Sequence, residues 1–550
     1  MKKALTLLLA FAVICTIATA CNKTNDDPTT QPTAPAEPKE LTLGFAYDAT
    51  TLDVQNMTDD GSYSLMYLLG EGLVRNDTGV IEPGVAERWD VSADGLTLTF
   101  YLRKNATWSD GSPLNAYDFE YTFMRVIDPD LGLQNAEGSL KMFKNARAYY
   151  EGSVSIDQVG IKAVDEYTLK IELEIPSLET LFTLAEYGYY PINKAMAEAN
   201  GKLYGTEPGK VLTNGPFTLI EWRFEDSQVL VKNENYWNKD AINLDKLTRR
   251  VGLAADVALD MMLVGELDEW SFDDINQVNT LVNAGFTSIP YVVGYQFVHM
   301  NSNGCTTDSK RFMENTNFRK ALNYAVNREG ITNSIYPGAE PVYRWSSPTM
   351  MGVSKLFHEE YPYQAWPTSG DAAKAKECLD LALQEIGATL SDVPELSLLC
   401  YDSQRGITVL TAVQDMLLST LGIKSKVDPQ PIQQMLDKAD NGEWDMWWGG
   451  KQKGDLDWVQ GFGGDFDYRS EDDASGYKNA RYLELLDKAK SALSMKERKD
   501  IVFEMEKILC EDPPSVLIGW TKNWLVLRSD ITGVLPDGFV VFWQYADIVR

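Results

Sequence analysis

The stretch that decides the fold is LSLLCYDSQRGITVLTAVQDMLLSTLGIKSKV, residues 396–427. It opens on an apolar run, continues as a helical stripe of apolar residues that ends at Gly422, and closes on a second predicted strand at 423–427. Residues 430–439 again have a helical pattern, and residues 444–448 contain three tryptophans. This order of strand, helix, strand, helix and strand predicts an α/β fold with a largely parallel, doubly wound sheet.

Two shorter stretches indicate strands of another kind. Residues 96–102 and 168–173 alternate apolar and polar side chains, which is typical of half-buried strands. The Gly-Pro pair at 215–216 marks a turn ahead of a further apolar run at 229–231. These segments predict sheet structure outside the doubly wound region.

Length and charge limit the function. The 550 residues are several times the length of one domain of about 150 residues, so we expect two to four domains. Lys and Arg number 50 and Asp and Glu 80, a formal charge of −30. Such a charge repels phosphate backbones and anionic lipid, and we therefore expect no nucleic-acid partner.

An enzyme is disfavoured by the residues that the chain lacks. His299 and His358 are its only histidines, which leaves little imidazole for a general base or a transition-metal site. No GxSxG, HExxH, phosphate-binding loop or dinucleotide fingerprint occurs. We therefore expect no catalytic residues, no metal and no cofactor.

The first residues have the pattern of an export signal. Lys2 and Lys3 precede an apolar run at 4–14, and Ala-Thr-Ala at 18–20 stands directly before Cys21. This end resembles a bacterial lipoprotein processing box, which implies a signal peptide at 1–20 and a lipid on Cys21. Residues 21–40, rich in Pro, Thr and charge, predict a disordered tether. No later stretch has 18 consecutive apolar residues, so we expect a membrane contact only through the lipid.

Four cysteines remain beyond the leader and the lipid site. Export permits disulfides, but four cysteines allow three pairings and the spacing selects none of them. Buried free thiols are equally compatible with the sequence. The four are Cys305, Cys378, Cys400 and Cys510.

A series of motifs then resembles one known family. It begins with Gly-Val-Ala-Glu-Arg-Trp at 84–89, Asp-Gly at 94–95, Phe-Tyr-Leu-Arg at 100–103 and Trp-Ser-Asp-Gly at 108–111. These motifs are similar to those of the large solute-binding proteins of ABC importers, the oligopeptide, dipeptide and nickel-binding family. The resemblance continues, in order, at 164–169, 190–193, 214–217, 233–237, 265–268 and 318–325.

The resemblance implies a periplasmic-binding-protein-like fold of the large class II, or cluster C, type. Its two lobes would be joined by two hinge crossings and would close over a ligand. Lobe one would comprise 41–83, 208–290 and 521–550, with an extra α+β domain at 84–207. Lobe two would comprise 291–520.

The binding region follows from the fold as well. Ligands of a doubly wound sheet lie beyond the carboxyl ends of its strands, and the predicted strand at 444–448 is followed at once by Gly449-Gly450. Glycines let a backbone approach a ligand closely. Lys451, next in the chain, would favour an anionic ligand as readily as the neighbouring acids favour an amine.

The family's peptide binders place an acid in this loop that pairs with the α-amino group of the peptide. An ungapped count puts Gly454 at that position, so the resemblance leaves Asp455 and Asp457 as alternative partners. On the facing lobe, the resemblance runs without gaps from Leu-Asp at 52–53 to Glu-Gly-Leu at 71–73, and it places Thr58 and Asp60 at the family's backbone contacts. As walls of the pocket we expect three rigid aromatic side chains, Trp447, Trp448 and Trp520.

The sequence thus predicts an exported, lipid-anchored protein on the extracytoplasmic face that captures oligopeptides for an ABC importer. Its partners would be a membrane permease and an ATPase, and we expect a monomer. One alternative is the same fold with another solute, such as a dipeptide or an oligosaccharide. Nickel is disfavoured by the two histidines. A second alternative is a surface receptor or adhesin.

Overall fold

The computed structural model describes residues 37–77, 80–133, 136–452, 459, 465–469, 475–537 and 540–549. The predicted leader, Cys21, nearly all of the tether, Asp455 and Asp457 lie outside the described residues. Within the part that is described, no helix is long and apolar enough to cross a membrane.

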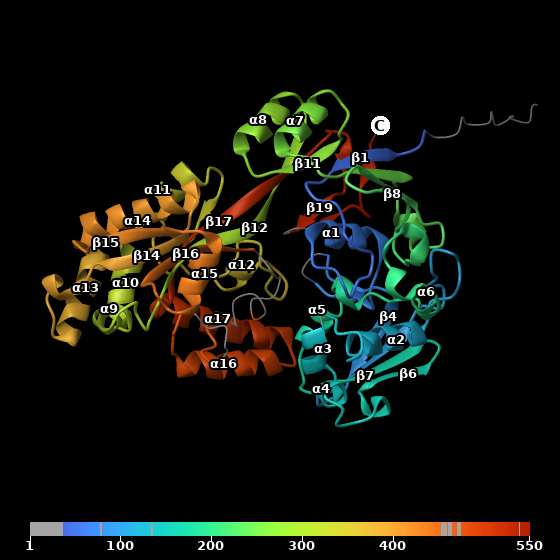
Figure 1. Ribbon diagram of the computed structural model, residues 1–550, viewed down its shortest axis with the longest axis horizontal. Helices are drawn as coiled ribbons and strands as arrows, with labels where there is room; N and C mark the ends of the chain where they lie inside the picture. Colours follow the sequence, from blue (N-terminus) through green and yellow to red (C-terminus); the bar gives the residue numbers. More distant parts are fainter. Residues whose placement is uncertain are drawn as a thin grey trace, which may run out of the picture. The chain divides into compact units, whose positions relative to one another are not determined.

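One 11-stranded sheet runs through the molecule (Figure 1). Its strand order is β15-β14-β16-β12-β17-β11-β1-β10-β9-β8, with β13 paired to β17. The strands are β1 (Glu40–Gly44), β8 (Phe217–Arg223), β9 (Ser227–Lys232), β10 (Lys246–Arg250), β11 (Glu269–Phe272), β12 (Thr287–Met300), β13 (Glu340–Pro341), β14 (Leu396–Tyr401), β15 (Ser425–Gln430), β16 (Met446–Gln452) and β17 (Ser515–Leu527). The long pair β12–β17 divides the sheet into two lobes, which confirms the two-lobed α/β prediction.

Lobe two contains the predicted doubly wound segment. The chain runs β14, α14 (Gln404–Leu421), β15, α15 (Ile432–Asp440) and β16, and β14 pairs in parallel with both β15 and β16. Ser403 caps α14 by accepting a hydrogen bond from the Gly406 N–H, and Gly422 ends it in the left-handed conformation that the sequence suggested. The predicted alternation of strands and helices is therefore confirmed. The sheet as a whole is not largely parallel as expected, because β12, β17, β9 and β8 pair with their neighbours in antiparallel fashion.

Two cores cover the two faces of this part of the sheet. On one face α10 (Thr316–Ala325), α13 (Ala372–Ile386) and α14 pack against Val298 and Trp448. On the other face α16 (Ala480–Ser491) and α17 (Met495–Glu511) pack against Tyr295, Phe297 and Trp520. The alternation of side chains along a strand sends these neighbours to opposite cores.

Lobe one is arranged around β1, which pairs in parallel with β10 and β11. The helix α1 (Asp60–Leu69) belongs to the core that includes β1 and β8, whereas α7 (Ala255–Leu263) and α8 (Ile275–Asn283) pack with β11 in a separate core. The apolar residues of α7 and α8 therefore cover a different part of the sheet from those of α1.

The extra domain has a sheet and a core of its own. Strands β4 (Ala86–Val91), β5 (Thr97–Leu102), β7 (Thr168–Glu172) and β6 (Ile161–Asp165) form an antiparallel sheet in that order, and α2 (Ala116–Val126) packs on it. The two strands predicted at 96–102 and 168–173 are β5 and β7. Both have alternating burial, as their sequence patterns indicated.

Shorter elements complete the chain. They are β2 (Val74–Arg75), β3 (Glu82–Pro83), α3 (Ala136–Met142), α4 (Ala146–Tyr150), α5 (Glu179–Thr183), α6 (Lys194–Asn200), α9 (Thr307–Met313), α11 (Arg328–Ile335), α12 (Phe357–Glu360), β18 (Ile531–Thr532), β19 (Leu535–Asp537), β20 (Val540–Phe542) and β21 (Asp547–Ile548).

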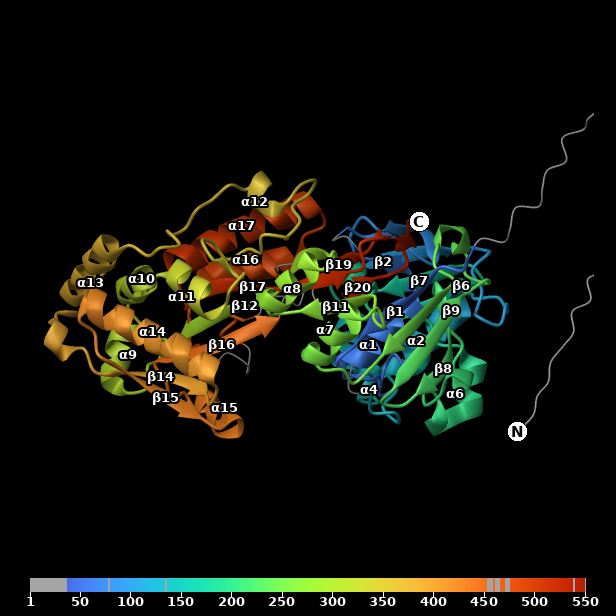
Figure 2. The same cartoon turned by 90° about the horizontal axis from the view of Figure 1, so that it is seen from above.

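The antiparallel pair β12–β17 carries the sheet from one lobe into the other (Figure 2). Residues 524–527 of β17 also pair with β11, and residues 294–300 of β12 also pair with β16. Between these two regions the register slips by one residue, from Val292 to Gly294. We call this slip the lobe crossing; the lobe boundaries expected at 290–291 and 520–521 lie next to it.

The four cysteines of the folded part are free thiols. Cys378, Cys400 and Cys510 are buried, and Cys305 is partly buried. The sequence left open either disulfides or buried free thiols, and the structure has free thiols.

A buried ion pair ties α17 to the segment after β13. The Arg344 guanidinium donates to both carboxylate oxygens of Glu506, and its Nε–Oε1 distance is 3.0 Å. The two side chains are 2% and 0% exposed, and the Ser346 N–H donates to the same carboxylate over 2.7 Å. Charge and hydrogen bonds are thus both satisfied, which buried charges require.

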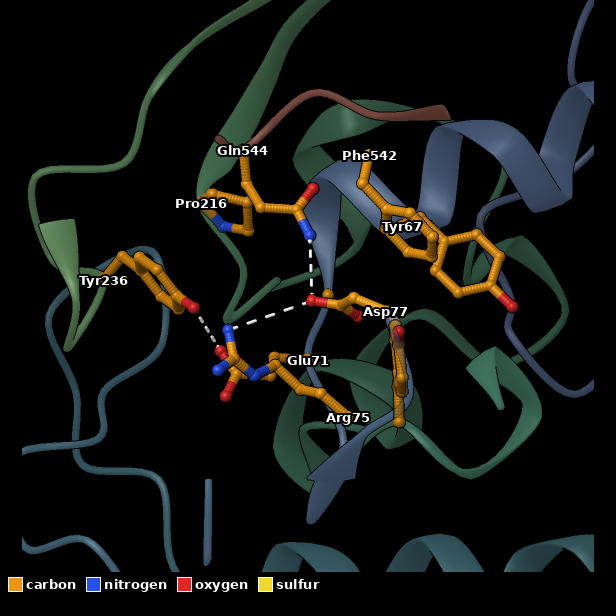
Figure 3. Close-up of a pocket in the computed structure, with 10 residues that line it drawn as sticks. Tyr67, Glu71, Arg75, Asp77, Pro216, Tyr236, Phe542 and Gln544 are labelled. Atoms are coloured by element: carbon orange, nitrogen blue, oxygen red, sulfur yellow. Dashed lines mark hydrogen bonds and ion pairs between the residues drawn. The ribbon is translucent and has the colours of Figure 1, made fainter. Parts of the chain in front are cut away.

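The end of the chain is held on lobe one by a polar cluster (Figure 3). Asp77 accepts hydrogen bonds from the Tyr545 hydroxyl and, over 3.3 Å, from Gln544. Arg75 donates to the same Tyr545 hydroxyl over 3.2 Å. Arg75, Asp77 and Gln544 line a small cavity, together with residues that include Tyr190 and Tyr236.

Glu71 is the buried carboxyl of this cavity. It is 4% exposed and accepts hydrogen bonds from the Tyr236 hydroxyl and the Trp237 indole, the latter over 3.0 Å. Burial outweighs these bonds and the nearby Arg75, and it raises the pKa of Glu71 to about 7. The folded protein therefore binds a proton here more tightly than the unfolded chain does.

Replacing one partner of the buried ion pair is expected to be costly. Glu506→Gln leaves the Arg344 charge buried without a countercharge, which costs about 3 to 5 kcal/mol. We expect the midpoint of thermal unfolding to fall by roughly 5 °C or more. The control is Glu504→Gln on the same helix, because Glu504 is 57% exposed and pairs with Arg481 at the surface. Equal unfolding midpoints for the two variants would contradict the stabilising role of the Arg344–Glu506 pair.

Glu71 makes stability depend on pH. Because its folded pKa of about 7 exceeds the ordinary 4.5, its protonated form favours folding, and this contribution is lost as pH rises from about 4.5 through 7. Glu71→Gln is expected to unfold at a higher temperature than the parent protein at pH 8, with the advantage gone at pH 4. Differential scanning calorimetry across this range measures it, with exposed Glu87→Gln as control. If the difference in unfolding temperature between Glu71→Gln and the parent protein did not change with pH, the raised pKa of Glu71 would be refuted.

Candidate functional site

The carboxyl ends of β14 and β16 form the candidate site. From β14 the chain passes through α14 to β15 on one side, and from β15 it returns through α15 to β16 on the other. The strand order therefore reverses at β14, and ligands of such sheets bind in the crevice beyond the strands at this point.

Gly449 and Gly450 lie within β16 and not in a turn after it. The expected strand ended at Trp448, whereas β16 continues to Gln452 and pairs with β12 throughout. A Cβ on Gly449 would lie 3.0 Å from the Phe297 ring, and one on Gly450 would lie 2.5 Å from the Gln296 amide nitrogen. The glycines thus let bulky side chains of β12 lie against β16, a tertiary contact that the local sequence did not reveal.

Lys451 follows in the same strand and has a charged partner. Its ammonium lies 2.5 Å from Asp465 Oδ1, and the side chains are 41% and 28% exposed. Burial raises the pKa of Asp465, although the Lys451 charge opposes the shift. Lys451, which the sequence suggested as a possible anion-binding group, therefore has its charge balanced by Asp465.

His299 lies on β12 directly opposite Trp447. Its Nδ1 is 2.5 Å from the Ser515 hydroxyl, and its ring centroid is 4.0 Å from that of Phe297. Burial, with the nearby Lys451, lowers the pKa of His299 to about 3, so the ring is neutral at physiological pH. Among the described residues no group of three or more His, Cys, Asp or Glu is placed to hold a metal ion.

The three expected aromatic walls differ in exposure. Trp448 is 3% exposed and packs on Tyr401, with ring centroids 5.3 Å apart. Trp520 is also 3% exposed and packs on Tyr295. Both belong to the cores of lobe two, because their positions in β16 and β17 turn them inward. Trp447 is half-buried.

On lobe one, Thr58 and Asp60 are exposed at the start of α1. Between them Asp59 caps the helix and accepts a hydrogen bond from the Ser62 N–H over 2.8 Å. The preceding segment is fixed by the bidentate pair of Asp53 with Arg125 at 2.6 and 3.0 Å. Thr58 and Asp60 are therefore accessible on a rigid support.

Sequence reasoning missed Gln296 and Asp465. Gln296 lies against Gly450, and Asp465 holds Lys451. Neither has a motif or a spacing that links it to the glycines, because strand pairing brings Gln296 there from another part of the chain. Only a knowledge of the β12–β16 register identifies it.

Comparison with known proteins agrees with this geometry. The model of the bacterial extracellular solute-binding proteins, family 5 Middle, matches residues 80–466. The chain is 29% identical over 513 residues to the oligopeptide-binding protein OppA of Bacillus subtilis, covering 91% of this chain and 89% of that protein. It is 28% identical over 514 residues to the murein peptide-binding protein MppA of Escherichia coli, covering 90% of each.

Solved structures give the same result. The unliganded open form of the murein tripeptide-binding protein MppA is 26% identical, with a TM-score of 0.80 over 94% of this chain and 98% of that one. The pheromone receptor PrgZ is also 26% identical, with a TM-score of 0.67 over 94% and 100%. Since the family match spans well over half of the sequence, the chain belongs to the bacterial extracellular solute-binding proteins of family 5, which bind solutes and are not enzymes.

Proposed function

We propose that this protein is a lipid-anchored oligopeptide-binding protein that delivers its ligand to an ABC permease and its ATPase. The observation that carries the proposal is the open edge of β16. Its partner β14 pairs with it only at Met446 and Trp447, and no other strand among the described residues pairs with that edge at Gly449 and Gly450. Gly450 is exposed, and Gly449 is partly buried.

Such an edge recognises main chain. An extended peptide can add to it as a further strand, and its backbone N–H and C=O groups then supply most of the affinity. Glycine side chains do not obstruct the approach. Recognition through the backbone tolerates many sequences, which suits a protein that collects oligopeptides of varied composition.

The relatives support a peptide ligand. Their names include oligopeptide, dipeptide and murein peptide-binding proteins. Within this proposal Asp455 or Asp457 pairs with the peptide amine, Trp447 contacts a ligand side chain, and Thr58 with Asp60 contacts the ligand from lobe one. Because Lys451 is paired with Asp465, we do not assign it to an anionic ligand, and we favour ligands that are not strongly acidic.

A dipeptide is the second candidate. A dipeptide-binding protein of Lactococcus lactis is 30% identical over 433 residues, covering 76% of this chain and 77% of that protein. Ligand length therefore separates the two candidates, and oligosaccharide panels test the remaining alternative.

We further propose that the leader is removed at Cys21, whose lipid anchors a monomer on the extracytoplasmic face. The apolar run at 4–14 and the small residues before Cys21 support this, as does the Pro- and Thr-rich stretch that follows.

Peptides are expected to stabilise the protein against heat. After bound ligand is removed by unfolding and refolding, thermal shifts are recorded with dipeptides, tri- to pentapeptide pools and oligosaccharides. Ligand at 100 times its dissociation constant adds about 2.7 kcal/mol. We expect the response to longer peptides to weaken on N-acetylation and in Asp455→Ala or Asp457→Ala, with exposed Asp273→Ala as control. A response to sugars alone would overturn the proposal.

The anchor is tested separately. Expressed in a bacterium and fractionated, the parent protein is expected in the membrane fraction, and Cys21→Ala is expected to leave it because the thiol that would carry the lipid has been removed. Metabolic labelling with an alkyne fatty acid should mark the parent only. Cys305→Ala serves as the control for the loss of one thiol. Membrane retention of Cys21→Ala without label would contradict the anchor.

A further inference from the structure

The turn between α11 and β13, residues 336–340, reaches across the lobe crossing. It belongs to lobe two, where Glu340 and Pro341 of β13 pair with Trp520 and Gly519 of β17. It also contacts two residues of β17 on the lobe-one side of the register slip, Lys522 and Trp524.

The closest contact joins Gly338 to Trp524. Gly338 has φ +93°, and a Cβ there would lie 2.3 Å from Trp524 Cη2. The indole is 8% exposed and packs in the α7–α8 core of lobe one. The turn therefore rests on a ring that is fixed in the other lobe, and only glycine permits both the backbone conformation and the approach.

A charge pair spans the same slip. The Lys522 ammonium lies 3.0 Å from a carboxylate oxygen of Glu340, with side chains 25% and 39% exposed. Lys522 is opposite Val292, the last paired residue of β12 before the slip. An ion pair this exposed contributes little stability by itself. It does, however, link the turn to β17 at a second point beside the contact of Gly338 with Trp524.

The turn also reaches toward the candidate ligand site. The Tyr336 hydroxyl donates to the side-chain amide oxygen Oε1 of Gln296 over 3.2 Å, and Gln296 is the residue that lies against Gly450. On its other side Tyr336 is covered by Arg405 of α14, with the guanidinium carbon 5.4 Å from the ring centroid. Contacts from Gly450 to Gln296 and from Gln296 to Tyr336 thus connect strand β16 with the turn at the lobe crossing.

We propose that residues 336–340 form a brace that sets the preferred angle between the lobes, with Gly338 and Trp524 as its contact surface and Lys522 with Glu340 as its lateral support. A register slip is a point where a strand pair bends more readily. A contact across the slip, made in one arrangement of the lobes and not in others, shifts the population among them. The proposal rests on ligand capture by lobe closure, and it identifies positioning residues for that motion.

The test measures the distance between the lobes in the protein without added ligand. Spin labels are placed on non-canonical side chains at exposed Lys162 in the extra domain and exposed Lys376 in α13, which leaves the native thiols untouched. Gly338→Ala is expected to displace the maximum of the distance distribution, because the new methyl group pushes the turn away from Trp524. The double variant Gly338→Ala with Trp524→Leu is expected to return toward the parent distribution.

The matched control is Gly387→Ala. Gly387 has φ +67° at the end of α13, and a Cβ there would meet no heavy atom within 4 Å. Alanine at this position also takes a positive φ, but its methyl group makes no such contact. Should Gly338→Ala and Gly387→Ala give the same distribution as the parent, the brace is refuted.

The ion pair gives an independent variant. Glu340→Lys places two cations across the slip and is expected to displace the distribution, and the swap Glu340→Lys with Lys522→Glu is expected to restore it. If Glu340→Lys alone does not displace the distribution, the pair of Lys522 with Glu340 is not part of the brace. Because none of these measurements needs a ligand, their failure is distinguishable from failure of the peptide proposal, which rests on the thermal shifts.

Discussion

The antiparallel pairing of β12 with β17 is the constraint on which the rest of the structure depends. Their ladder belongs to one continuous sheet, so the strands of both lobes take their register from the same two segments. On one side the ladder positions β16 and its glycines, and on the other it positions β11 next to β1. Backbone hydrogen bonds are short and directional, so the ladder holds its register except at two shifts, between Val292 and Gly294 and between Gln296 and Phe297.

Much of the fold was predictable because its signals are local. The doubly wound order at 396–449 follows from periodicity, and the ends of α14 follow from Ser403 and Gly422. Motif resemblance supplied the two lobes. The extent of β16 was not predictable, since Gly449-Gly450 is typical of a turn, and only pairing with Phe297 and Gln296 keeps it in the sheet.

The candidate site was predictable in part for the same reason. Position in the strand order pointed to Gly449 and Gly450 before any contact was known. Burial of Trp448 and Trp520, and the Asp465 that neutralises Lys451, are tertiary facts that a sequence pattern does not contain. An aromatic-rich strand looks the same whether its rings face a ligand or a core.

The unpaired thiols have a consequence for how the protein matures. Cys378, Cys400 and Cys510 lie inside packed cores, and burial raises the pKa of all three thiols, so little reactive thiolate forms. The folded body is therefore held by packing and hydrogen bonds and requires no oxidant. Folding of this domain need not wait for disulfides to form or rearrange. A reducing environment finds no disulfide among the four cysteines of the folded part to break. Its stability is in this sense independent of the redox state of the compartment that receives it.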